Sequence, residues 1–76
     1  MSSSYYAPLV VLPVIITTPG EYITRGGERV TISKTSSLND HGCVGVYAVN
    51  GISDAWHRSG RIYAGMESLN DIVREA

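Results

Sequence analysis

The residues best suited to chemistry stand close together at Asp40, His41 and Cys43, which supply a carboxylate, an imidazole and a thiol. Such a set could form an activated nucleophile or, with His57, part of a zinc site. Catalytic groups of this kind usually come from separated segments, and a structural zinc site normally has four ligands at recognised spacings. A cysteine within an apolar run is more often a small buried hydrophobe. We therefore expect no enzyme activity, no metal and no cofactor.

The segment DAWHRSGRIYAG, residues 54 to 65, is the second candidate for a site, and it holds the single tryptophan of the chain. If its serine–glycine pair forms a two-residue hairpin loop, alternation places four side chains on one face. These are Trp56, Arg58, Arg61 and Tyr63. Arginines directly opposite each other repel, so the pair needs a carboxylate such as Asp54 or Glu67, a stacked indole or an external anion. Aromatic and arginine residues are enriched in binding hot spots, which predicts a partner-binding face. The alternative is that the two aromatics form the core.

The N-terminal part of the chain carries no charge from residue 2 to residue 20. Residues 1 to 6 are predicted to be disordered, and residues 7 to 18 to form an apolar strand or arm. Pro8 and Pro13 cannot donate ladder hydrogen bonds, which favours an edge strand or an intersubunit arm over a central strand. The run is too short to cross a bilayer, so no membrane partner is expected. The predicted arm residues are Leu9, Val10, Val11, Leu12, Val14, Ile15 and Ile16.

Residues 19 to 76 are predicted to form a single small β-rich domain. Glycine-containing turn signals stand at 26–27, 50–51 and 59–60, and the stretches between them have strand-like composition. Val30 and Ile32 alternate with polar residues and should face the core, whereas residues 43 to 49 are apolar on both faces and indicate a central strand. The last residues, SLNDIVREA, fit either a short helix or a final strand. The expected fold is mainly β: an antiparallel meander or barrel of four to five strands, with a short C-terminal helix as the alternative.

Composition limits the classes of partner. The 76 residues carry a net charge of −1 and only 17% charged residues, which gives no broad attraction to nucleic acid. A local basic surface made by Arg25, Arg29, Lys34, Arg58 and Arg61 keeps a nucleic-acid-binding module as an alternative function. A chain this short buries little surface, so a homodimer, or a homo-oligomeric structural or assembly protein, is a further alternative.

Residues 19 to 73 resemble a family of small phage and prophage accessory proteins of unknown function. The resemblance rests on PGEYITRGGERVTI, which matches PG-x-Y-x-TR-x-G-x-x-V-x-I, on WHRSGR, which matches W-x-x-x-GR, and on SLNDIV, which matches S-x-x-DIV. It implies a non-enzymatic protein of the bacterial cytoplasm, in an infected or lysogenic cell. It also implies action by binding and inhibiting a host protein or complex, including counter-defence of the anti-CRISPR kind. Tyr5 and Tyr6 join the hairpin face as expected partner-binding residues.

Overall fold

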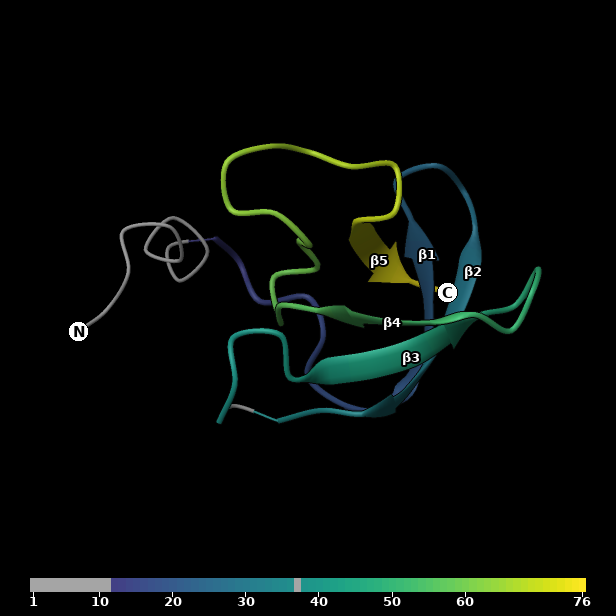
Figure 1. The fold of residues 1–76 in the computed structure, drawn as a ribbon, viewed down its shortest axis with the longest axis horizontal. Coiled ribbons are helices and arrows are strands. Elements are labelled where there is room, and N and C mark those ends of the chain that lie inside the picture. Colours follow the sequence, from purple (N-terminus) through teal and green to yellow (C-terminus); the bar gives the residue numbers. More distant parts are fainter. Residues whose placement is uncertain (1–11, 37) are drawn as a thin grey trace.

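The computed structural model of the protein describes residues 12–36 and 38–76. Its five strands form one antiparallel sheet in the spatial order β4-β3-β2-β1-β5 (Figure 1). The strands are β1 (Gly20–Thr24), β2 (Arg29–Lys34), β3 (Cys43–Tyr47), β4 (Ser53–Trp56) and β5 (Ile72–Glu75). The prediction of an antiparallel meander is confirmed for the first four strands, and the sheet remains open.

Two of the predicted glycine turns connect neighbouring strands. Gly27 (φ 91°) lies in the turn between β1 and β2, and Gly51 (φ 72°) in the turn between β3 and β4. Both positions have the positive φ that glycine adopts without a steric penalty. The third predicted turn, at Ser59-Gly60, also forms, but no strand follows it.

The helical alternative for the C-terminal residues is wrong, because residues 72 to 75 form β5 beside β1. Ser68 and Asp71 have the spacing of a capping box at the start of a helix, and the corresponding contact forms: Asp71 Oδ2 accepts a hydrogen bond from the Ser68 amide at 2.9 Å. The chain then enters the sheet, where Ile72 is buried and β1 gains a second neighbour. Tertiary pairing therefore overrides a local helix signal.

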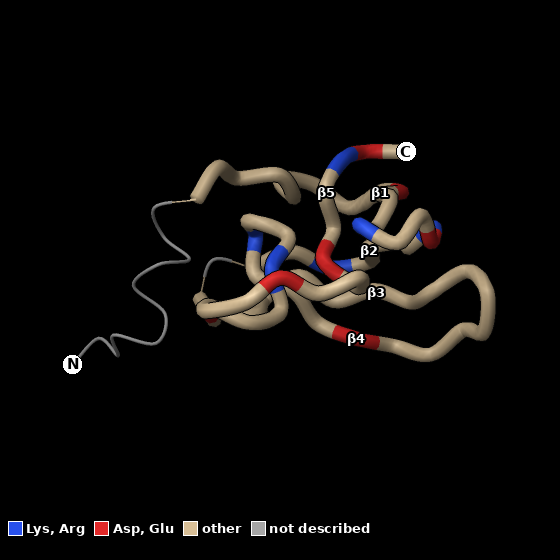
Figure 2. The backbone as a smooth tube through the Cα atoms, turned by 90° about the horizontal axis from the view of Figure 1, so that it is seen from above, with Lys and Arg blue, Asp and Glu red and all other residues tan. Residues whose placement is uncertain are grey.

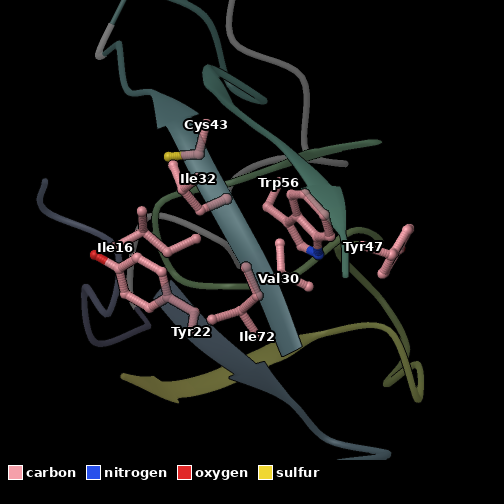
Figure 3. Close-up of a cluster of buried hydrophobic side chains, with 8 residues drawn as sticks. All are labelled: Ile16, Tyr22, Val30, Ile32, Cys43, Tyr47, Trp56 and Ile72. Carbon is pink, nitrogen blue, oxygen red and sulfur yellow. The ribbon is translucent and has the colours of Figure 1, made fainter. Parts of the chain in front are cut away.

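One face of the sheet carries the hydrophobic core (Figure 3). Its side chains come from all five strands and from the segment before β1: Ile16, Tyr22, Val30, Ile32, Cys43, Tyr47, Trp56 and Ile72. The predicted inward placement of Val30 and Ile32 is confirmed. Trp56 is 0% exposed, its ring meets Tyr47 edge to face with centroids 5.5 Å apart, and its Nε1–H donates to the Asn70 carbonyl at 2.8 Å.

Irregular segments, rather than helices, cover this core within the described residues. The amides of Ile15 and Ile16 both donate to the Arg58 carbonyl at 2.9 Å, which ties residues before β1 to the turn after β4. The same turn is fastened to β5, since the Ile72 amide donates to the Gly60 carbonyl at 2.8 Å. Gly60 has a φ of 87°, and a Cβ there would lie 1.9 Å from the Ile72 carbonyl oxygen. The turn therefore requires glycine and bridges the two edges of the open sheet.

Trp56→Ala should lower the free energy of unfolding by about 3–5 kcal/mol, because it removes the largest side chain of the core and leaves a cavity. Trp56→Phe should cost clearly less, since an aromatic ring remains and only part of the volume and the Asn70 hydrogen bond are lost. Urea unfolding followed by circular dichroism measures both. Equal stability of Trp56→Ala and the wild type would contradict a central role for this ring.

Candidate protein-binding surface

The predicted aromatic–arginine face does not assemble. The His57 amide donates to the Arg61 carbonyl and the Gly60 amide to the His57 carbonyl, so the connection is longer than the predicted two-residue loop. The two-residue loop would have placed Trp56 opposite Tyr63 across a hairpin, and this predicted cross-strand pair is therefore wrong. Trp56 lies in the core instead of on a binding face, while Arg58 and Tyr63 are exposed and Arg61 is half-buried. The alternative prediction, that both aromatic side chains form the core, is correct for Trp56 and wrong for Tyr63.

The expected N-terminal interface residues divide into two groups. Tyr5, Tyr6, Leu9, Val10 and Val11 lie outside the described residues. Among the rest, Ile16 is buried in the core, so an intersubunit role is incorrect for it. Leu12 and Ile15 are half-buried and Val14 is exposed. No strand forms over residues 12–18, because the proline-containing segment bonds to the Arg58 carbonyl rather than to a strand.

Arg61 belongs to a charge cluster centred on Asp71, a residue that is 1% exposed. Asp71 Oδ1 accepts from the Ile62 amide at 3.2 Å, and its Oδ2 lies 3.3 Å from Arg25 Nη2 and 4.0 Å from Arg61 Nε. Glu67 lies within 3.8 Å of both guanidinium groups. The predicted need of Arg61 for a carboxylate is met by Glu67, but the buried Asp71 was not predicted. The positive charges of the two arginines offset the negative charges of the two carboxylates. The cluster therefore connects segments of the fold and is not a site for an external anion.

The residues first considered for catalysis are engaged in structural hydrogen bonds. His41 Nε2 lies 2.7 Å from the Ile62 carbonyl, and since a carbonyl only accepts, this nitrogen carries the proton. His57 Nδ1 accepts from the Ser59 amide at 3.0 Å. Cys43 is buried, and burial raises the pKa of its thiol, although the nearby Arg58 cation acts in the opposite direction. Burial therefore disfavours the reactive thiolate form of Cys43.

Three further observations concern metal binding, membrane crossing and a surface cleft. In the described part of the chain, no three His, Cys, Asp or Glu side chains are grouped to hold a metal ion. Nor do residues 12–36 and 38–76 contain a helix of the length and apolarity that crossing a membrane requires. A cleft of about 400 Å³ beside the turn after β4 has mixed walls, lined by Val14, Ile16, Thr17, Thr35, Ser36, Cys43 and Arg58.

The face of the sheet opposite the core, here called the outer face, is not covered by any segment within residues 12–36 and 38–76. Alternation from the buried residues of β3 points Val44 and Val46 outward, where they are 37% and 40% exposed. Their cross-strand neighbours in β4 are Ala55 and Ser53. The prediction of an interior strand is confirmed for residues 43 to 47, whereas residues 48 and 49 belong to the turn, and only one of the two apolar faces of β3 is buried.

The hairpin of β3 and β4 continues this apolar surface to its tip. Val49 and Ile52 in the connecting turn are 70% and 60% exposed, and the tip projects from the body of the sheet (Figure 1). From residue 43 to residue 56 the only charged side chain is Asp54, seen as the single red segment on β4 in Figure 2. Several exposed aliphatic side chains on one hairpin are typical of protein interaction sites.

The open edge of β4 is blocked by its own aspartate. The Tyr47 amide donates to the Ile52 carbonyl, so by alternation the backbone groups of Ala55 face away from β3. Asp54 Oδ1 accepts the Ala55 N–H at 2.9 Å, and Asp54 Oδ2 accepts the Tyr47 hydroxyl at 2.7 Å. An edge donor already bonded within the chain offers little to an incoming strand. Burial raises the pKa of Tyr47, and the hydrogen bond and negative charge of Asp54 raise it further.

The other edge, at β5, is covered in a similar way. The Ala76 amide donates to the Glu21 carbonyl, which turns the backbone of Glu75 away from β1. Arg74 Nη1 donates to the Glu75 carbonyl at 3.3 Å, and the Ile72 amide donates to the Gly60 carbonyl. Outward backbone groups at both edges of the sheet are thus bonded within the chain, and the outer face is the better binding surface.

Comparison of the chain with protein-family models, with curated proteins and with solved structures finds no significant match.

Asp71→Asn should lower the free energy of unfolding by about 2–3 kcal/mol, because a buried carboxylate with charged and amide donors is replaced by a neutral group. Glu67→Gln is the matched control and should change it by at most about 1 kcal/mol, since Glu67 is well exposed. Chemical denaturation of both variants measures the difference. Equal losses in the two variants would refute the central role of Asp71.

His57 should make stability fall in mild acid. Burial, with a contribution from Arg58, lowers the pKa of His57 from its ordinary value of 6.5. The unfolded chain then binds the proton more readily, so stability is complete above pH 6.5 and declines as the pH falls from 6.5 toward the folded pKa. Urea midpoints between about pH 8 and pH 5.5 test this. His57→Asn retains an acceptor for the Ser59 amide without titrating and should flatten the profile; an unchanged profile would exclude His57 as the cause.

Proposed function

We propose that this chain is a non-enzymatic accessory protein of a phage or prophage that binds and inhibits a host protein in the bacterial cytoplasm. The observation that carries the proposal is the group of aliphatic side chains on the β3–β4 hairpin that the described residues leave exposed: Val44, Val46, Val49 and Ile52. A protein of this size cannot easily spare so many exposed aliphatic side chains, because its core is small. An interaction partner that covers them is the simplest reason for their presence.

The arrangement of the potential reactive groups is consistent with a binding role. The Cys43 thiol is buried, and both histidine rings hold backbone groups of irregular segments. The two histidine contacts stabilise the fold, which supports a binding role for the chain. The resemblance to small phage proteins supports the biological context, and an inhibitor of a CRISPR effector is one member of the class proposed.

The nucleic-acid alternative loses most of its expected surface. Of the five basic residues considered for it, Arg25 and Arg61 are paired with acidic groups around Asp71, and Arg29 is paired with Glu21. Trp56, the strongest stacking platform in the chain, is buried. Basic grooves and exposed aromatic rings are what such modules use, so the geometry favours protein binding.

The combined substitution Val44→Ser and Val46→Ser should abolish capture of the host protein with little loss of stability, because both side chains are partly exposed already. Affinity capture from a bacterial lysate, quantified by mass spectrometry, measures the effect. Met66→Ser is the matched control, since Met66 is 61% exposed in the segment between β4 and β5. Capture that survives the double substitution but is lost in Met66→Ser would place the interface elsewhere.

A cellular assay tests inhibition itself. Expression of the chain in a bacterium whose CRISPR effector restricts a phage should restore plaque formation, and the double serine variant should fail to do so. Restored plating by both proteins would separate the activity from the outer face. Restoration by neither would argue against this particular class of target.

A further inference from the structure

We propose that the partner of the outer face presents an acidic surface, with apolar side chains bordered on one flank by carboxylates, and that it lies flat on the sheet instead of adding a strand to it. This inference rests on the proposed function, because it names the chemistry of the same binding surface. Three observations support it: the charges beside the apolar surface, their position on one flank of it, and the bonded backbone groups at the sheet edges.

The charged rim of the outer face is predominantly basic. By register, Glu21 and Arg29 in the first hairpin, Lys34 at the end of β2 and Arg74 in β5 lie on this side of the sheet. Arg29 and Glu21 form an ion pair and offset each other. Among residues 12–36 and 38–76, no carboxylate lies within ion-pairing distance of Lys34 or Arg74. The rim therefore keeps two cations available for a partner.

The two cations lie on the same flank of the apolar β3–β4 surface, because β2 borders β3 and β5 lies two strands beyond β2. Lys34 is in register with Val44 of β3, and Arg74 is in register with Ile23 of β1. From the spacing of strands and residues, the two cations are separated by roughly 10 Å across the sheet and roughly 15 Å along it. An apolar patch bordered by charged side chains matches the usual anatomy of an interface with a polar rim.

The sheet edges argue against strand addition as the binding mode. Asp54 holds the outward Ala55 amide of β4, and Arg74 covers the outward Glu75 carbonyl of β5. A partner strand at β4 would have to break the Asp54 contact, which also secures the Tyr47 hydroxyl. Contact through side chains of the outer face needs no such rearrangement.

A second copy of this chain is a poor occupant of the surface. Stacking two outer faces would bring together two surfaces that each carry uncompensated positive charge. Like-charge juxtaposition opposes association, while a carboxylate-bearing partner would be attracted and oriented. The aliphatic centre likewise fits protein side chains better than bases, since the face has no exposed aromatic ring among the strand residues.

The experiment is capture from a nuclease-treated bacterial lysate by the full chain at low and high salt. The wild type should retain a dominant protein of acidic composition at low salt, and about 0.5 M salt should release most of it. Lys34→Glu combined with Arg74→Glu should reduce the retained amount about tenfold or more, because both attractions become repulsions. Arg58→Glu changes an exposed cation in the turn after β4, away from the outer face, and should leave retention intact.

The outcomes separate this inference from the proposed function. Retention that resists salt and the double charge reversal, but is lost in the double serine variant, would overturn the acidic partner and leave the proposed function standing. No protein retained by the wild type would overturn both. Three other results would overturn the acidic-protein assignment. Retention could be lost in Arg58→Glu alone, or it could depend on nucleic acid and disappear on nuclease treatment. The purified chain could also be a dimer by light scattering, with the dimer abolished by the double charge reversal.

Discussion

The buried carboxylate of Asp71 joins three parts of the chain that share no strand pairing. Its oxygens meet the side chain of Arg25 beyond β1, the amide of Ile62 in the irregular segment after β4, and the amide of Ser68 before β5. In a sheet with no helix on it in the described residues, such segments must cover the core, and their polar groups need partners. Asp71 supplies several of these partners at one point. The positions of the Gly60 turn and of β5 depend on it, and through them the packing around Trp56.

The two faces of the sheet therefore have different roles. The inner face is covered by loops that are fastened to one another, whereas the outer face has no cover among the described residues and carries the apolar side chains of the β3–β4 hairpin. Fixed edges at Asp54 and Arg74 reduce the chance of indiscriminate strand pairing. A surface with exposed aliphatic groups and closed edges favours a selective face-on contact, which is the binding mode we propose.

Sequence patterns predicted the strands where local chemistry and tertiary structure agree. The alternation around Val30 and Ile32 and the glycine turns at 27 and 51 both appear in the structure. The prediction failed where a distant partner decides: β5 is a strand because β1 offers an edge, and Trp56 is buried because the core of a small domain needs its volume. The outer-face valines were visible in the alternation of β3, but a sequence does not say which apolar face stays uncovered. The spacing of Ser68 and Asp71 gave a local signal, but the contacts of Asp71 with Arg25 and Ile62 gave none, since these partners lie farther away in the chain.

The placement of Trp56 also gives the molecule an internal optical probe. It is the only tryptophan, it is fully buried, and it lies on the side of the sheet opposite the uncovered valines. Its fluorescence should be blue-shifted in the native protein and should move to longer wavelength only when the inner face opens. Occupancy of the outer face would leave the emission in place, so one spectrum can distinguish a bound chain from an unfolding one.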